Sequence, residues 1–222
     1  MTRTARELLE TTTADLAPDP RANRLVPLIA RGAASRDTLA ALALEQHGVI
    51  AADRRSFLHL AQRASAEDAP ACAAFFRTLA EGEEVAGERL TAFARACGVD
   101  RERAAAYTPL PGCQAYPAYV AWLALNAGPS DAVLALTANF SAWGGYCATI
   151  SEALRTRYGF PDASRAFFDL FAEPSPDLEG KAEAAVQEGL DTGRLDEHLS
   201  HRYGSLLQTY EAMFWTALER QA

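Results

Sequence analysis

The chain has 222 residues, 49% of them hydrophobic, and a formal net charge of −8 at pH 7. This length and apolar content suit a folded domain with a substantial core. The acidic balance, with no basic stripe to offset it, argues against a nucleic-acid partner. No apolar run approaches the roughly 20 residues that span a bilayer, so no membrane segment is expected.

The N-terminal segment is acidic and lacks an apolar region, so no signal peptide is expected. The four cysteines show neither CxxC spacing nor a companion histidine cluster: Cys72, Cys97, Cys113 and Cys147. We therefore expect a cytoplasmic protein with reduced thiols, no bound metal and no cofactor.

Helices are predicted nearly throughout, because alanine is abundant, β-branched residues are sparse and no alternating run is long enough for a strand. We expect helices over residues 2–16, 21–31, 36–64, 68–97, 117–127, 130–158, 162–172, 177–190 and 193–220. Gly98 is expected to cap the fourth helix, residues 108–112 to be irregular, and Ser130 to be an N-cap. No linker or repeat divides the chain, which predicts one all-α domain over residues 1–222.

In the predicted helix 36–64, His47 interrupts an apolar stretch, with Glu45 close before it. A satisfied core histidine is favoured for His47, and a catalytic or ligand-binding role is the alternative. The next helix carries a row of glutamates without a histidine, which indicates a solvated acidic face rather than a metal site: Glu81, Glu84 and Glu88.

Tyr116 precedes Pro117, a residue suited to the first position of a helix, so Tyr116 is predicted to project from a helix start. In the following long helix, Asn139, Trp143 and Tyr146 recur on one face. Asn139 and Tyr146 place hydrogen-bonding groups inward, where a small ligand is one possible partner. Tyr116 could stack on such a ligand or belong to the core.

Three further residues of the long helix leave alternatives open. The pair Gly144-Gly145 requires a close neighbour, and helix packing is favoured over a ligand. Cys147 could be an apolar filler or a thiol nucleophile. Filler is favoured, because nothing in the sequence supplies a base or cation that would lower the pKa of the thiol.

The C-terminal helix has a carboxylate inside its apolar stripe. Glu211 lies between Leu207 and Trp215, one turn to either side. A buried, unpaired carboxylate is costly, so this group either pairs or takes up a proton, and both states suit general acid–base chemistry. The alternative is a glutamate at the edge of the stripe that reaches water.

Several of these segments resemble the TenA family, also called thiaminase II, from about residue 20 to the C-terminus. Residues 210–215 (YEAMFW) resemble its E-x-x-F-W signature, and residues 115–119 (AYPAY) are similar to its A-Y-x-x-Y segment. Residues 28–32 (LIARG) and 44–47 (LEQH) resemble the family's opening, in which a glycine precedes a Q-D pair. The resemblance implies a single-domain heme-oxygenase-like helical bundle, related to the PqqC proteins, with Glu211 as catalytic acid/base and Tyr116 lining a pyrimidine pocket.

Two departures from the family pattern bear on the chemistry. Residues 138–143 (ANFSAW) stand where the family has its nucleophilic cysteine, and they contain none. His47 stands at the pyrimidine-binding aspartate, with Glu45 as a possible substitute. Covalent catalysis through the family position is therefore excluded. A related di-iron branch is also disfavoured, because residues 171–179 (FAEPSPDLE) contain prolines and no histidine.

The resemblance leads to an expected small-molecule ligand, with Glu211 assisting attack by water on a thiamin-related aminopyrimidine and cleaving a C–N bond. The expected substrate-binding residues are His47, Glu45, Tyr116, Asn139, Trp143, Tyr146 and Tyr210. The alternatives are a ligand-binding or regulatory protein without turnover, an enzyme for a different small metabolite, and a structural subunit. The resemblance also implies a homo-oligomer, either a dimer or a tetramer.

Overall fold

The computed structural model describes residues 3–19 and 21–221, and in this part of the chain every regular element is a helix. The helices are α1 (Ala5–Asp15), α2 (Leu25–Ala30), α3 (Arg36–Ala66), α4 (Pro70–Ala96), α5 (Arg101–Ala106), α6 (Pro111–Asn126), α7 (Pro129–Thr156), α8 (Asp162–Ala172), α9 (Pro176–Thr192) and α10 (Glu197–Glu219). The all-α prediction is confirmed. No helix among the described residues combines the length and the apolar character needed to cross a membrane.

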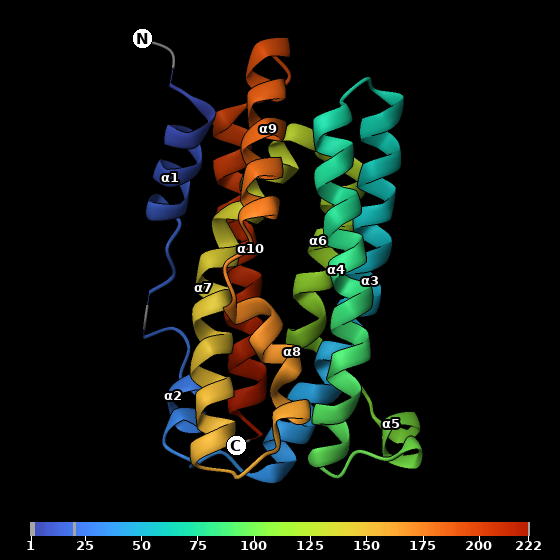
Figure 1. Ribbon diagram of the computed structural model, residues 1–222, viewed down its shortest axis with the longest axis vertical. Coiled ribbons are helices and arrows are strands. Elements are labelled where there is room, and N and C mark those ends of the chain that lie inside the picture. Colours follow the sequence, from blue (N-terminus) through green and yellow to red (C-terminus); the bar gives the residue numbers. More distant parts are fainter. Residues whose placement is uncertain (1–2, 20, 222) are drawn as a thin grey trace.

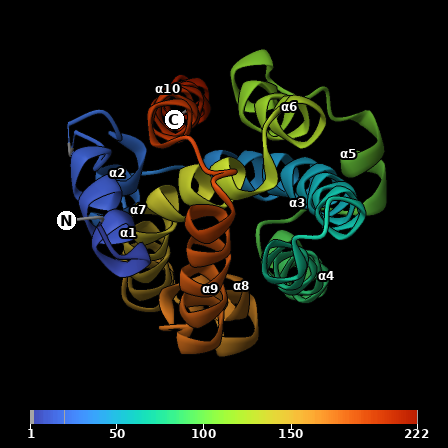
Figure 2. The same ribbon diagram turned by 90° about the horizontal axis from the view of Figure 1, so that it is seen from above.

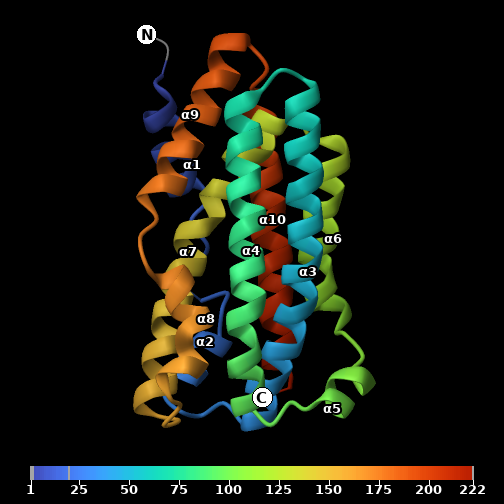
Figure 3. The same cartoon turned by 45° about the vertical axis from the view of Figure 1, so that its right-hand side comes forward.

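Six helices form a closed ring around the middle of the molecule. Helix α3 packs on α6, α6 on α10, α10 on α7, α7 on α8, α8 on α4, and α4 returns to α3. The ring is visible in the view along the long axis (Figure 2). Helices α1 and α2 pack outside it on α7, whereas α9 packs on α4 and α7 as α8 does, nearer the other end of the molecule (Figure 1). Figure 3 shows α10 running behind the α3–α4 pair. Side chains from six helices therefore converge inside the ring.

Capping residues account for the starts of α3 and α10 and for the end of α4. The side chain of Ser35 accepts a hydrogen bond from the Thr38 N–H at 3.0 Å and starts α3. Asp196 does the same for the Leu199 N–H at the start of α10, also at 3.0 Å. Gly98 follows α4 with a φ of +77°, a left-handed conformation that favours glycine, so its predicted capping role is confirmed.

The helix boundaries between residues 101 and 130 differ from the prediction. Residues 111 and 112, expected to be irregular, open α6, with Pro111 at its first turn, and Pro117 lies inside this helix. Taken alone, either proline would suit the first turn of a helix, where the missing N–H has no backbone partner. Tyr116 consequently lies in mid-helix rather than at a helix start. Helix α5 was not predicted, and Gly128 rather than Ser130 is the N-cap of α7.

Two glycines mark close approaches between ring helices. A Cβ on Gly112 would lie 3.0 Å from the Met213 carbonyl oxygen, so the start of α6 packs directly on the α10 backbone. A Cβ on Gly144 would lie 3.0 Å from the Phe171 carbonyl oxygen at the end of α8. Helix packing, the favoured interpretation, therefore explains Gly144. Gly145 has no such neighbour.

Candidate functional site

Glu211 is buried inside the ring with one carboxyl oxygen free. The side chain is 8% exposed, and its Oε1 accepts a hydrogen bond from the Trp215 indole N–H at 3.0 Å. Its Oε2 is buried and has no hydrogen-bond partner among the described residues. Burial raises the pKa of Glu211, and the Trp215 and Asn139 side chains oppose part of that rise. A buried carboxyl with a raised pKa is suited to both giving and taking a proton.

Asn139 of α7 links Glu211 to Tyr116 of α6. Its side chain is 5% exposed, and its Oδ1 has no hydrogen-bond partner among the described residues. Burial raises the pKa of both Tyr116 and Glu211, and the amide of Asn139 lies close enough to lower both values somewhat. Three elements of the ring thus bring an amide, a phenol and a carboxyl together, each with unused hydrogen-bonding capacity or an altered pKa.

Two further carboxyls belong to the same cluster. Besides burial, the negative charges of Asp53, Glu211 and Glu83, in that order, raise the pKa of Tyr116. Asp53 comes from α3 and Glu83 from α4. Among the described residues, no group of three or more His, Cys, Asp or Glu side chains is arranged to hold a metal ion. Charges from α3, α4 and α10 therefore act together on the Tyr116 hydroxyl.

Sequence reasoning missed Asp53, although a signal was present. Asp53 is 4% exposed, and its Oδ1 is buried without a hydrogen-bond partner in the described chain. It lies in the apolar stripe of α3, between Ile50 and Phe57 at helical spacing, so it is misplaced in the same way as Glu211. Glu83 gave a weaker signal, because exposed glutamates surround it in the sequence.

Aromatic rings line the site on its α7 and α10 sides. The Trp143 and Trp215 ring centroids are 6.0 Å apart, and Tyr146 packs edge-on against Trp215 at 5.5 Å. Tyr210 packs instead against Tyr119 of α6, with centroids 4.9 Å apart. Trp143, Tyr146 and Tyr210 are each partly buried. A flat ligand beside Glu211 would find ring faces to stack on.

The structure does not place His47 with these residues. His47 is exposed on α3, so neither the core role nor the ligand-orienting role expected for it agrees with its position. Glu45 is 1% exposed, but protein donors occupy both of its oxygens. Oε1 accepts from the Tyr107 hydroxyl at 2.7 Å and from the Leu110 N–H at 2.6 Å, and Oε2 accepts from the Gln114 amide at 3.3 Å. Glu45 therefore holds the α5–α6 connection rather than facing a ligand.

Cys147 is fully buried in the core beside the site. Burial, and then the charge of Glu211, raises the pKa of its thiol well above the ordinary value. A thiol in this environment stays protonated and is a poor nucleophile. The packing interpretation of Cys147 is thus the one its surroundings favour.

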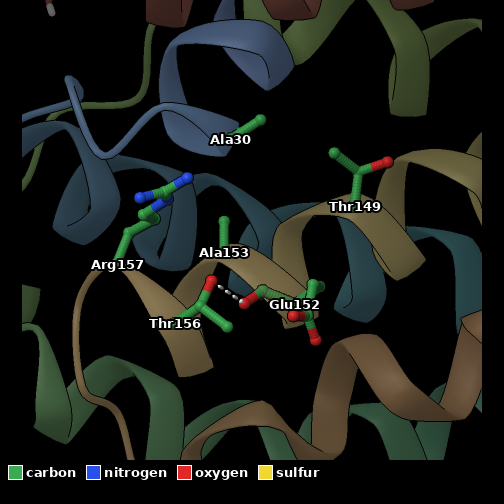
Figure 4. A pocket seen from close by; sticks show the side chains of 6 residues that line it. All are labelled: Ala30, Thr149, Glu152, Ala153, Thr156 and Arg157. Atoms are coloured by element: carbon green, nitrogen blue, oxygen red, sulfur yellow. Dashed lines mark hydrogen bonds between the residues drawn. The ribbon is translucent and has the colours of Figure 1, made fainter.

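A surface hollow lies elsewhere, on the outer side of α7 (Figure 4). It is lined by Ala30, Thr149, Glu152, Ala153, Thr156 and Arg157. Its polar groups are largely satisfied within the chain: the Thr156 hydroxyl donates to the Glu152 carbonyl at 2.8 Å (Figure 4), and the Glu152 carboxylate pairs with Arg155. None of the lining residues surrounds Tyr116, so the hollow is separate from the candidate site.

Comparisons with known proteins agree with this architecture. The family model described as "TENA/THI-4/PQQC family" matches residues 25–221. A solved TenA homologue from P. horikoshii OT3 aligns with a TM-score of 0.68 at 15% identity, covering 98% of this chain and 97% of that one. A domain of unknown function with a heme oxygenase-like fold from Shewanella denitrificans OS217 also has a TM-score of 0.68, at 14% identity, covering 96% and 89%. A search of curated proteins found no match. The fold is thus heme oxygenase-like, as expected.

Proposed function

Because this chain belongs to the TENA/THI-4/PQQC family, we propose that it binds a small heteroaromatic ligand inside the helical ring and hydrolyses a C–N bond of a thiamin-related aminopyrimidine. The observation that carries this proposal is the carboxyl of Glu211, which is buried, fixed through one oxygen by Trp215 and free at the other. Asn139, Tyr116 and an aromatic wall made of Trp143, Tyr146 and Trp215 would orient the ligand beside it. Tyr210, next to Glu211, would close the α6 side.

In this reaction the oxygen of a water molecule bonds to the exocyclic methylene carbon of the pyrimidine, and the bond from that carbon to the amine nitrogen breaks. Glu211 accepts a proton from the water. With aminomethyl-pyrimidine it passes this proton to the departing amine, and the products are hydroxymethyl-pyrimidine and ammonia. With thiamin the leaving group is a neutral thiazole, which needs no proton, so Glu211 returns the proton to the solvent. Water is the proposed nucleophile because residues 138–143 hold no cysteine and burial keeps Cys147 protonated.

The position of Asp53 changes the expected ligand contacts. Its buried, unpartnered Oδ1 makes it the better candidate for the carboxylate that orients the aminopyrimidine, since His47 is exposed and the Glu45 carboxylate is already engaged. A carboxylate can accept two hydrogen bonds from an amino group and an adjacent protonated ring nitrogen.

The experiment is to incubate the purified protein with thiamin and with aminomethyl-pyrimidine and to follow the release of hydroxymethyl-pyrimidine. We expect release by the wild type, and a loss of about a hundredfold or more in Glu211→Gln, the usual contribution of a general acid–base group. Glu219→Gln is the matched control, because Glu219 lies on the same helix and faces Arg24 at 4.0 Å. Full activity in Glu211→Gln would remove Glu211 from the mechanism.

A ligand-binding protein without turnover is the second candidate, and the missing cysteine in residues 138–143 is the observation that favours it. Tight binding of the aminopyrimidine by the wild type, with no release of product, would establish this alternative and contradict hydrolysis.

We also propose that the protein forms a homo-oligomer and that it is cytoplasmic. Exposed apolar side chains on the adjoining helices α6 and α10 support self-association: Trp122, Leu125, Leu206 and Met213.

A further inference from the structure

We propose that Asp53 and Glu83 form a carboxyl pair that selects a positively charged, amidine-like ligand group over a neutral one. The inference rests on the proposed function only in taking the interior of the ring as the ligand site. It adds the charge of the ligand, and it assigns Glu83 of α4 a part in specificity.

The packing of α3 against α4 sets the two carboxyls at about the same level. The helices are antiparallel, and two contacts fix their register. Arg54 of α3 pairs with Glu84 of α4 at 3.0 Å, and a Cβ on Gly87 would lie 3.6 Å from the Ile50 side chain. Asp53 and Glu83 each directly precede one member of the Arg54–Glu84 pair, so both lie close to that contact along the helix pair.

Asp53 and Glu83 are more buried than their sequence neighbours Arg54 and Glu84. Arg54 and Glu84 form a surface ion pair with side chains 42% and 61% exposed. Asp53 is 4% exposed and Glu83 is partly buried. Burial raises the pKa of both carboxyls, and the charge of Glu83 raises that of Asp53 further. Two adjacent buried carboxyls cannot both ionise without a cation, so the pair retains a proton when no ligand is bound.

The groups that face the pair from other helices are acidic or neutral. Tyr116 of α6 responds to the charges of Asp53, Glu83 and Glu211, and Asn139 of α7 lies beside it. On α3 itself, Arg54 pairs with Glu84, and its Nε is buried without a partner among the described residues. The other unpartnered buried atoms of this cluster are acceptors: Asp53 Oδ1, Asn139 Oδ1 and Glu211 Oε2. A ligand that satisfies these three atoms must bring hydrogen-bond donors, such as N–H groups.

A planar amidinium meets these requirements. Its two N–H groups point the same way and match a carboxylate in a bidentate arrangement, and its charge offsets the repulsion between the carboxylates of Asp53 and Glu83, so that the pair gives up a proton on binding. An attached aromatic ring would stack against the Trp143 and Trp215 rings of the aromatic wall. A neutral ring of the same shape could stack equally well but would leave the second carboxyl unpaired and protonated.

The test compares benzamidine, which carries an amidinium, with benzamide, its neutral analogue of the same shape, by isothermal titration calorimetry. We expect the wild type to bind benzamidine about tenfold tighter than benzamide or more, since one charged hydrogen bond is worth that much. Glu83→Gln should bring the two affinities to within about twofold, and Asp53→Asn should weaken benzamidine binding at least as much. Glu84→Gln, the adjacent exposed carboxylate, is the matched control and should keep the wild-type preference.

A second readout follows the shared proton. Benzamidine binding near neutral pH should release a proton from the wild type, seen as a dependence of the binding enthalpy on the buffer, and Glu83→Gln should release less. Equal affinities for the two compounds in the wild type, or an undiminished preference in Glu83→Gln protein with an unchanged melting temperature, would overturn the proposal.

The same titrations in Glu211→Gln separate this inference from the proposed function. A cation preference that persists without any hydrolysis would leave the carboxyl pair standing and remove only the turnover. Hydrolysis without a cation preference would do the reverse.

Discussion

Glu211 and Trp215 are one helical turn apart, and their hydrogen bond holds the carboxyl in a single orientation. The bond uses one oxygen and leaves the other for a ligand or a water molecule. Cys147 lies close enough for the charge of Glu211 to raise the pKa of its thiol, so the negative charge that would assist Glu211 chemistry also suppresses a thiolate. At this scale the site favours proton transfer over nucleophilic attack by sulfur.

Replacing Cys147 by alanine tests whether its thiol takes part in the reaction. We expect product release within about threefold of the wild type, because the thiol contributes packing rather than chemistry, and a loss of about 1–2 kcal/mol in the free energy of unfolding from the small cavity. Activity assays and urea denaturation measure the two effects. Abolished release in a variant that folds normally would show that Cys147 is a nucleophile.

The same residues show what one sequence can reveal about a site. Glu211 and Asp53 are both carboxylates inside apolar stripes, and helical periodicity alone is enough to single them out. His47 stands out because it interrupts an apolar stretch and follows a glutamine, and it lies six residues before Asp53. A helix turns about 100° per residue, so six residues carry a side chain to a different face. Burial within the periodic pattern is therefore a better guide to this site than a short motif.

At the scale of elements, the buried carboxylate of Glu45 holds the end of α5 and the start of α6 in place. Glu45 of α3 accepts hydrogen bonds from Tyr107, Leu110 and Gln114, and Leu110 is the N-cap residue of α6. Since α6 carries Tyr116, this anchor also sets the position of a site residue.

Glu45→Ala should therefore destabilise the protein by about 2–4 kcal/mol, because it leaves buried donors without a partner. Hydrogen exchange should speed up most at the start of α6. Glu45→Gln, which keeps an oxygen acceptor, is the control and should lose less. A Glu45→Ala protein as stable as the wild type would show that the three contacts contribute little.

The helices differ in how well their ends could be predicted. Helix α4 ends just before Gly98, whose capping role was predicted, because a left-handed glycine is a local signal. The start of α6 could not be placed, since Pro111 and Pro117 are equally good openings locally. The choice depends on the close packing of Gly112 against α10, a contact between segments about 100 residues apart.

At the scale of the whole molecule, the closed ring contains several buried carboxyls with raised pKa values. Burial raises the pKa of Asp53, Glu83 and Glu211 above their ordinary values of 3.8, 4.5 and 4.5. The folded protein therefore binds more protons than the unfolded chain above these ordinary values, and its stability falls as the pH rises through the raised ones. The folded protein is thus most stable when these groups are protonated.

We expect the wild type to lose stability between about pH 6 and about pH 8.5, and the double variant Asp53→Asn, Glu83→Gln to lose less over the same range. Urea denaturation at several pH values gives both slopes. The comparison with the variant isolates the carboxyl pair from the surface ion pairs, which the two proteins share. Identical slopes would show that the pair titrates alike in the folded and unfolded states.

The aromatic wall also gives the protein an optical signal. The chain has three tryptophans, and two of them, Trp143 and Trp215, lie 6.0 Å apart at the site. Trp122 is on α6 and 43% exposed, so its emission differs from that of the two interior indoles. Replacing Trp122 by phenylalanine leaves a protein whose tryptophan fluorescence arises only from the wall. A ligand that stacks there changes the emission directly, and no label has to be added to observe it.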